Sequence, residues 1–102
     1  PYFYSGFAMR SEDMIISSQQ DGISVRDKFS IYLNTSGASK ICIVAKRGES
    51  YSCSLIYKEQ SKLVSEDYST IEFDISHEKF QRQLMLWCNV QTTLLIKEAW
   101  VH

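Results

Sequence analysis

Apolar and polar residues alternate along several runs of this chain, as in strands with one buried and one solvent-facing side. The clearest run is Thr70–Ile75, in which Ile71, Phe73 and Ile75 face the same way. Ile41–Ala45 is apolar throughout, which predicts a strand buried on both faces. Further strand candidates are Lys28–Leu33, Tyr51–Tyr57 and Leu94–Val101, with weaker signals in Tyr2–Met9 and Met14–Ser17.

Residues 76–88 fit two different structures. A helix beginning near Ser76 would bring Phe80, Leu84 and Trp87 to helical spacing, so a short helix near 76–82 stays an alternative. A turn followed by a strand over Gln83–Val90 fits the same residues, and we favour the strand.

The runs are separated by turn signals at Gly22, Gly37 and Gly48. Seven or eight short strands with such turns predict an all-β fold, a sandwich or a barrel. The stretch from Thr70 to Val101 resembles the late strands of jelly-roll carbohydrate-binding modules, in which an Asp-x-Ser turn precedes two long strands. The resemblance covers about a third of the chain and favours a compact antiparallel β-sandwich that is jelly-roll-like. It does not place the calcium or sugar-contact residues of those modules.

Length and charge narrow the function classes. The chain has 102 residues, which is the size of one domain, so we expect residues 1–102 to form a single sandwich. The formal net charge of -1 excludes a generally basic nucleic-acid binder and an acidic disordered tail. No apolar run approaches the roughly 18 residues of a membrane helix, so no membrane insertion is expected.

The spacing of two cysteines suggests a disulfide. If Arg47 and Gly48 form a two-residue hairpin loop, Cys42 lies directly opposite Cys53. Opposed Cβ atoms lie about 4.5–5.5 Å apart, close enough for a bridge after a small adjustment. A Cys42–Cys53 disulfide would indicate an oxidising compartment. The alternative is that these two and Cys88 are buried free thiols.

Catalytic and metal-binding patterns are sparse. The two histidines are His77 and His102, and no cysteine spacing typical of zinc sites occurs. Cys88 lies in an apolar run without a cationic neighbour that would activate it as a nucleophile. Glu72 and Asp74 alternate with apolar residues, as on the wet face of a strand. We therefore predict neither an enzyme nor a bound metal or cofactor.

Basic and aromatic residues near the Arg47–Gly48 turn raise the alternative of single-stranded nucleic acid stacking on Tyr51 and Tyr57. Both tyrosines alternate with serines, as core residues of a half-buried strand do, and Glu49 and Glu59 offset the basic charge. The basic residues are Lys40, Lys46, Arg47 and Lys58. Solvated strand ends explain them better, so no nucleic-acid partner is expected.

Recognition by a surface is what remains. The strands and loops are rich in serine, which is typical of extracellular and virion-surface β-domains, and Asn34 begins a possible N-glycosylation signal. Trp87 and Trp100 are the leading candidates for a binding site, with core packing as the alternative for each. Tyr51 and Tyr57 are further aromatic candidates.

These patterns favour a non-catalytic recognition domain outside the cytoplasm, at a cell or virion surface, whose receptor is a protein or a glycan. One form would be the terminal head of a viral or phage attachment fibre, which would be a homo-oligomer, most simply a trimer. A second hypothesis is a periplasmic or secreted small protein, such as an inhibitor, a sensor domain or a secretion-system accessory, that carries the Cys42–Cys53 disulfide. A small enzyme with a cleft around His77 and a carboxylate is the third.

Overall fold

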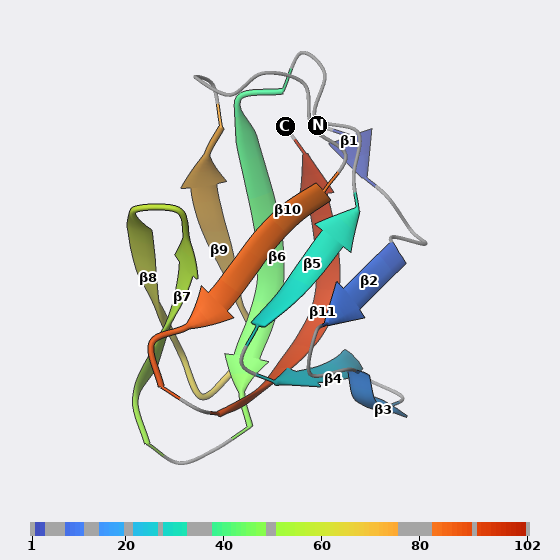
Figure 1. The fold of residues 1–102 in the computed structure, drawn as a ribbon, viewed down its shortest axis with the longest axis vertical. Helices are drawn as coiled ribbons and strands as arrows, with labels where there is room; N and C mark the ends of the chain where they lie inside the picture. Colours follow the sequence, from blue (N-terminus) through green and yellow to red (C-terminus); the bar gives the residue numbers. More distant parts are fainter. Residues whose placement is uncertain are drawn as a thin grey trace.

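The computed structural model describes residues 2–3, 8–11, 15–19, 22–26, 28–32, 38–48, 51–75, 83–90 and 92–101. These residues form strands and short connections, without a helix (Figure 1). The strands are β1 (Tyr2–Phe3), β2 (Ala8–Ser11), β3 (Ile15–Gln19), β4 (Gly22–Arg26), β5 (Lys28–Tyr32), β6 (Lys40–Arg47), β7 (Cys53–Tyr57), β8 (Gln60–Val64), β9 (Ser69–Asp74), β10 (Gln83–Cys88) and β11 (Thr93–Val101). No helix long and apolar enough to cross a membrane occurs among the described residues.

The strands build two antiparallel sheets that pack face to face. The six-stranded sheet has the order β3-β4-β11-β6-β9, with β1 also paired to β11. The five-stranded sheet has the order β2-β5-β10-β7-β8. Strands β4 to β11 alone give four strands to each sheet, and the three N-terminal strands extend these two layers.

The chain crosses between the two sheets at nearly every connection from β4 to β11. Between β4 and β11, only β7 and β8 are consecutive and also paired, across a tight turn at Lys58 and Glu59. Lys58 adopts a positive φ of 53°, as such turns require. Two four-stranded antiparallel sheets joined in this way form a jelly-roll sandwich. The prediction of an all-β, jelly-roll-like sandwich is confirmed.

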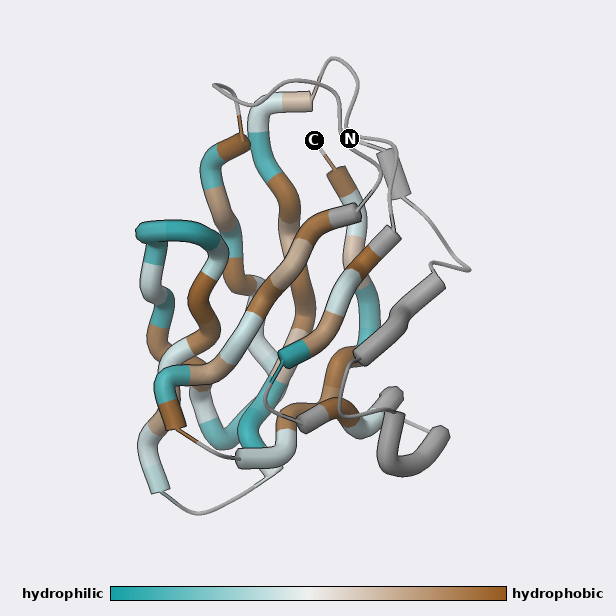
Figure 2. The backbone as a smooth tube through the Cα atoms, viewed as in Figure 1, coloured by the Kyte–Doolittle hydropathy of each residue, from teal (hydrophilic) through white to brown (hydrophobic). Residues whose placement is uncertain are grey.

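The core lies between the sheets and is built from alternate residues of each strand. Figure 2 shows the alternation of hydrophobic and hydrophilic residues along the strands. The largest fully buried side chains include Tyr57, Phe29 and Phe73. Ile71, Phe73 and Ile75 are buried, which confirms the inward face predicted for their run. The outward residues of the same strands are left on the two outer faces, where binding sites can form.

The structure resolves one sequence alternative and corrects another prediction. Gln83–Cys88 is a strand, as favoured, while the alternative helix near 76–82 lies outside the described residues. The predicted hairpin at Arg47 and Gly48 is wrong, because the chain there crosses from the six-stranded to the five-stranded sheet. The Gly48 amide donates to the carbonyl of Thr93 over 2.8 Å, and a Cβ at this position would lie 3.2 Å from that oxygen.

Candidate functional site

The outer face of the five-stranded sheet carries an aromatic centre. Leu84 and Leu86 of β10 are buried in the core, so Met85 and Trp87 lie on the opposite, outer face, where both are partly exposed. Strand β10 lies in the middle of its sheet, between β5 and β7. Trp87 therefore lies on a central strand of this face, one residue before the end of β10.

Neighbouring strands surround Trp87 with a mixture of apolar and polar residues. Trp87 pairs with Ile56 on β7 and with Lys28 on β5. Ser30 pairs with Met85, and its hydroxyl lies 3.5 Å from the Met85 sulfur. Trp87 thus has an aliphatic neighbour on β7 and a basic neighbour on β5.

Asn89 completes the border just beyond the end of β10. Its backbone amide donates to the carbonyl of Ser54 over 3.1 Å, and its side-chain Oδ1 accepts from the Ser54 amide over 2.7 Å. The bond to Oδ1 holds the Asn89 side chain in place, and no described residue accepts a hydrogen bond from its Nδ2. We call the set of Lys28, Ser30, Ser54, Ile56, Met85, Trp87 and Asn89 the Trp87 face.

The second tryptophan lies on the opposite side of the molecule. Trp100 belongs to β11 in the six-stranded sheet, where it is partly exposed and pairs with Cys42 of β6. Cys42 also points outward, yet it is only 2% exposed. Its thiol lies 3.7 Å from Glu72 Oε2, and Glu72 in turn lies 3.5 Å from the Lys40 ammonium. The two tryptophans therefore cannot form one site.

The structure separates the two cysteines that the predicted hairpin brought together. Cys42 lies on the outer face of the six-stranded sheet, whereas Cys53 belongs to the core side of β7 in the five-stranded sheet. Both are free thiols, as is the partly buried Cys88. The register argument for a Cys42–Cys53 disulfide therefore fails, because it assumed that β6 and β7 pair.

The two candidate tyrosines have different environments. Tyr51 is 48% exposed in the connection before β7. Tyr57 is 2% exposed, and its ring meets that of Phe73 edge to face with 6.0 Å between centroids. Tyr57 is a core residue, so we exclude it from the candidate site. Asn34 lies outside the described residues.

An aromatic–cationic cluster appears that the sequence analysis did not single out. The ammonium groups of Lys46 and Lys97 lie 4.8 and 5.3 Å from the ring centroid of Tyr68. Lys97 is exposed on the outer face of the six-stranded sheet, beside the buried Ile96 and at a β-bulge between Ile96 and Glu98. The three residues come from separate parts of the chain, and the pairing of β6 with β11 and β9 brings them together.

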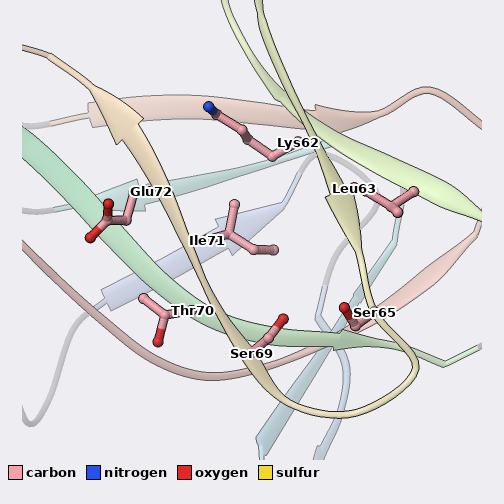
Figure 3. A pocket seen from close by; sticks show the side chains of 7 residues that line it. All are labelled: Lys62, Leu63, Ser65, Ser69, Thr70, Ile71 and Glu72. Carbon is pink, nitrogen blue, oxygen red and sulfur yellow. The ribbon is translucent and has the colours of Figure 1, made fainter.

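A pocket of about 530 Å³ lies between β8 and β9, away from the Trp87 face (Figure 3). In this view Lys62 extends over the space between the two strands, while Leu63 lies on the other side of β8. The lining is mostly polar and consists of Lys62, Leu63, Ser65, Ser69, Thr70, Ile71 and Glu72.

The surroundings of the Cys42 thiol determine its reactivity. Burial raises the pKa of the Cys42 thiol, and the charge of Glu72 raises it further, so this thiol stays protonated and weakly nucleophilic. Within the described ranges, no three His, Cys, Asp or Glu residues gather as metal ligands. His77 and His102 lie outside those ranges. Comparisons of the chain with models of protein families, with curated proteins and with solved structures give no match.

Proposed function

We propose that this chain is a non-catalytic recognition domain that binds a glycan through the Trp87 face. The observation that carries the proposal is a partly exposed tryptophan on a central strand of an outer sheet face, with the partly exposed Met85 and Ile56 beside it. Solvent-facing sheet surfaces are normally polar, so an aromatic and aliphatic centre there needs an explanation. The proposed surroundings are a cell or virion surface, outside the cytoplasm.

The composition of the face suits a sugar. An indole ring offers a flat apolar surface on which the C–H face of a pyranose can lie, and its contact area makes it a common anchor residue. The Asn89 amide, already held by Ser54, would donate to a sugar hydroxyl without further loss of side-chain freedom. Lys28, which is exposed, supplies a polar group on the opposite border, whereas Ser30 is buried.

Single-tryptophan variants can test the proposal. The Trp100→Phe variant keeps Trp87 as its only indole, and the matched Trp87→Phe variant keeps only Trp100. Each variant would be titrated with a panel of soluble oligosaccharides while its tryptophan emission is recorded. We expect a saturable emission change in the Trp100→Phe variant and none in the Trp87→Phe variant.

The same panel distinguishes the alternatives. A change confined to Trp100 would move the site to the six-stranded sheet and overturn the proposal. If no oligosaccharide of the panel changes the emission of Trp87, the glycan proposal fails, and a protein receptor on the same face would become the leading hypothesis.

A further inference from the structure

The pocket between β8 and β9 lies where two sheet edges meet. Both strands are consecutive in the chain, but β8 ends the five-stranded sheet and β9 ends the six-stranded sheet. They approach each other without pairing, and we call the pocket between them the β8–β9 slot. Because the slot lies apart from the Trp87 face, a ligand bound in it would be independent of the proposed glycan site.

The hydrogen bonds around β9 show which of its backbone groups face β6 and which face the unpaired edge of the sheet. The Ile75 amide donates to the Ser39 carbonyl over 2.9 Å, so Ile75 faces β6. The neighbouring Asp74 faces the other way, because its amide donates to Gln60 Oε1 over 2.8 Å and its carbonyl accepts from Gln60 Nε2 over 2.7 Å. Backbone groups alternate in direction along an antiparallel strand. Thr70 and Glu72 therefore also direct their amide and carbonyl groups to the free edge.

Gln60 shows what this edge accepts. Its side-chain carboxamide has the donor and acceptor of a peptide group, and it satisfies both backbone groups of Asp74 at once. The next residues whose backbone groups face the free edge, Glu72 and Thr70, line the slot. No described residue bonds to their edge-facing backbone groups. The edge is thus filled at one position and open at the following two.

Charge in the slot favours an acidic group. Lys62 lines the slot from β8 and forms no ion pair or hydrogen bond with any described residue. The Glu72 carboxylate already lies 3.5 Å from the Lys40 ammonium, and it accepts a hydrogen bond from the Cys42 thiol. The groups left to bind an extended ligand are therefore the edge-facing backbone amides and carbonyls of Thr70 and Glu72, the Lys62 ammonium and the hydroxyls of Ser65, Ser69 and Thr70.

The ends of the slot limit the length of the ligand. The Gln60–Asp74 pair closes one end, and the connection from Ser65 to Tyr68 closes the other. A long strand could not run through without displacing Gln60. We propose that the β8–β9 slot binds the C-terminal end of an extended peptide from a partner protein, which pairs with Thr70 and Glu72 while its carboxylate contacts Lys62.

Binding of a chain end can be tested with a synthetic probe and amide NMR spectra of the labelled protein. The probe is an acetylated pentapeptide of alternating valine and threonine with a free carboxylate. We expect saturable shifts of the Thr70 and Glu72 amides. The same peptide with an amidated C-terminus should bind about tenfold more weakly, because it lacks the charged partner of Lys62. N-methylation of its alternate backbone nitrogens should abolish the shifts.

Two protein variants with matched controls separate backbone pairing from charge. The Thr70→Pro variant loses the edge-facing amide but keeps every hydrogen bond to β6, so the fold should persist and binding of the probe should disappear. The matched Thr70→Ala variant keeps the amide and should bind the probe normally. Lys62→Gln should bind the acid and amide probes equally. Unchanged binding to folded Thr70→Pro, or equal affinity of the native protein for the acid and amide probes, would overturn the proposal. No shift at millimolar probe would overturn it as well and would leave the glycan proposal intact.

Discussion

Cys42 and Cys53 show how environment controls a thiol. Burial raises the pKa of each, and Glu72 adds to the effect at Cys42. Cys88 is less buried than either. A disulfide reagent reacts with the thiolate and needs access to it. In the native protein we therefore expect Cys88 to react first and the other two to react only slowly, with three reactive thiols after denaturation. Fewer than three in the denatured, non-reduced protein would contradict the free-thiol structure.

The same two residues link stability to pH. The folded protein holds the thiol protons to higher pH than the unfolded chain, whose cysteines ionise around pH 9.0. Their contribution to the free energy of unfolding is complete below that pH and falls as the pH rises through the folded pKa values. Denaturant titrations at pH 7 and pH 10 should show a smaller loss of stability in Cys42→Ala than in the native protein. An identical loss in both would show that Cys42 makes no contribution.

Phe73 tests the core at single-residue resolution. Its ring is fully buried and packs against Tyr57. Replacing a buried phenylalanine by alanine leaves a cavity and typically costs about 3–5 kcal/mol. We expect Phe73→Ala to lose stability in that range in urea titrations. Ser61→Ala, an exposed position on β8, should change stability by less than about 0.5 kcal/mol.

At the level of single elements, β9 gives a pattern that amide hydrogen exchange can check. Ile71 and Phe73 direct their amides to β6, so these should exchange slowly, while Thr70 and Glu72 should exchange fast. The Asp74 amide should be protected by Gln60. In Gln60→Ala its exchange should accelerate, with Phe73 unchanged as an internal control. Equal protection of neighbouring residues along β9 would refute the assigned direction of its backbone groups.

Alternation predicted the strands well because it is a local property. Residues 70–75 and 94–101 are predicted as strands from sequence, and the structure places residues 70–74 in β9 and residues 94–101 in β11. The link from β6 to β7 could not be read in the same way. A turn signal at Gly48 fits a hairpin and a crossing between sheets equally, and only the packing of the sheets decides between them. The Cys42–Cys53 register depended on that undetermined step.

The candidate sites also differ in whether a local sequence pattern predicts them or only the packing of the sheets does. Alternation within Tyr51–Tyr57 already predicts Tyr57 on the inward face, and that residue is buried. Trp87 is predicted as a binding residue because tryptophan is a common anchor residue, and the structure adds that it lies on an outer face. The slot between β8 and β9 and the lysines around Tyr68 both depend on strand order. Neither leaves a local signal in the sequence.

At the scale of the whole molecule, the proposed surface role has a consequence for assembly. The domain measures 36 × 27 × 24 Å, and its formal charge of -1 gives little repulsion between copies. If it forms the head of an attachment fibre, light scattering should give about three times the chain mass of 11.8 kDa at micromolar concentration. A monomeric mass would exclude the fibre-head form and leave a single-copy recognition domain.

The repeated crossing between sheets also determines how the chain can reach this structure. From β4 to β11 only the β7–β8 hairpin joins neighbours in sequence, so every other pairing must close a longer loop first. Proteins dominated by such non-local pairings fold in roughly milliseconds to seconds. The β7–β8 hairpin and the β3–β4 hairpin are the pairings that can form locally, and the Trp87 face and the β8–β9 slot are completed only when the other strands of both sheets assemble with them.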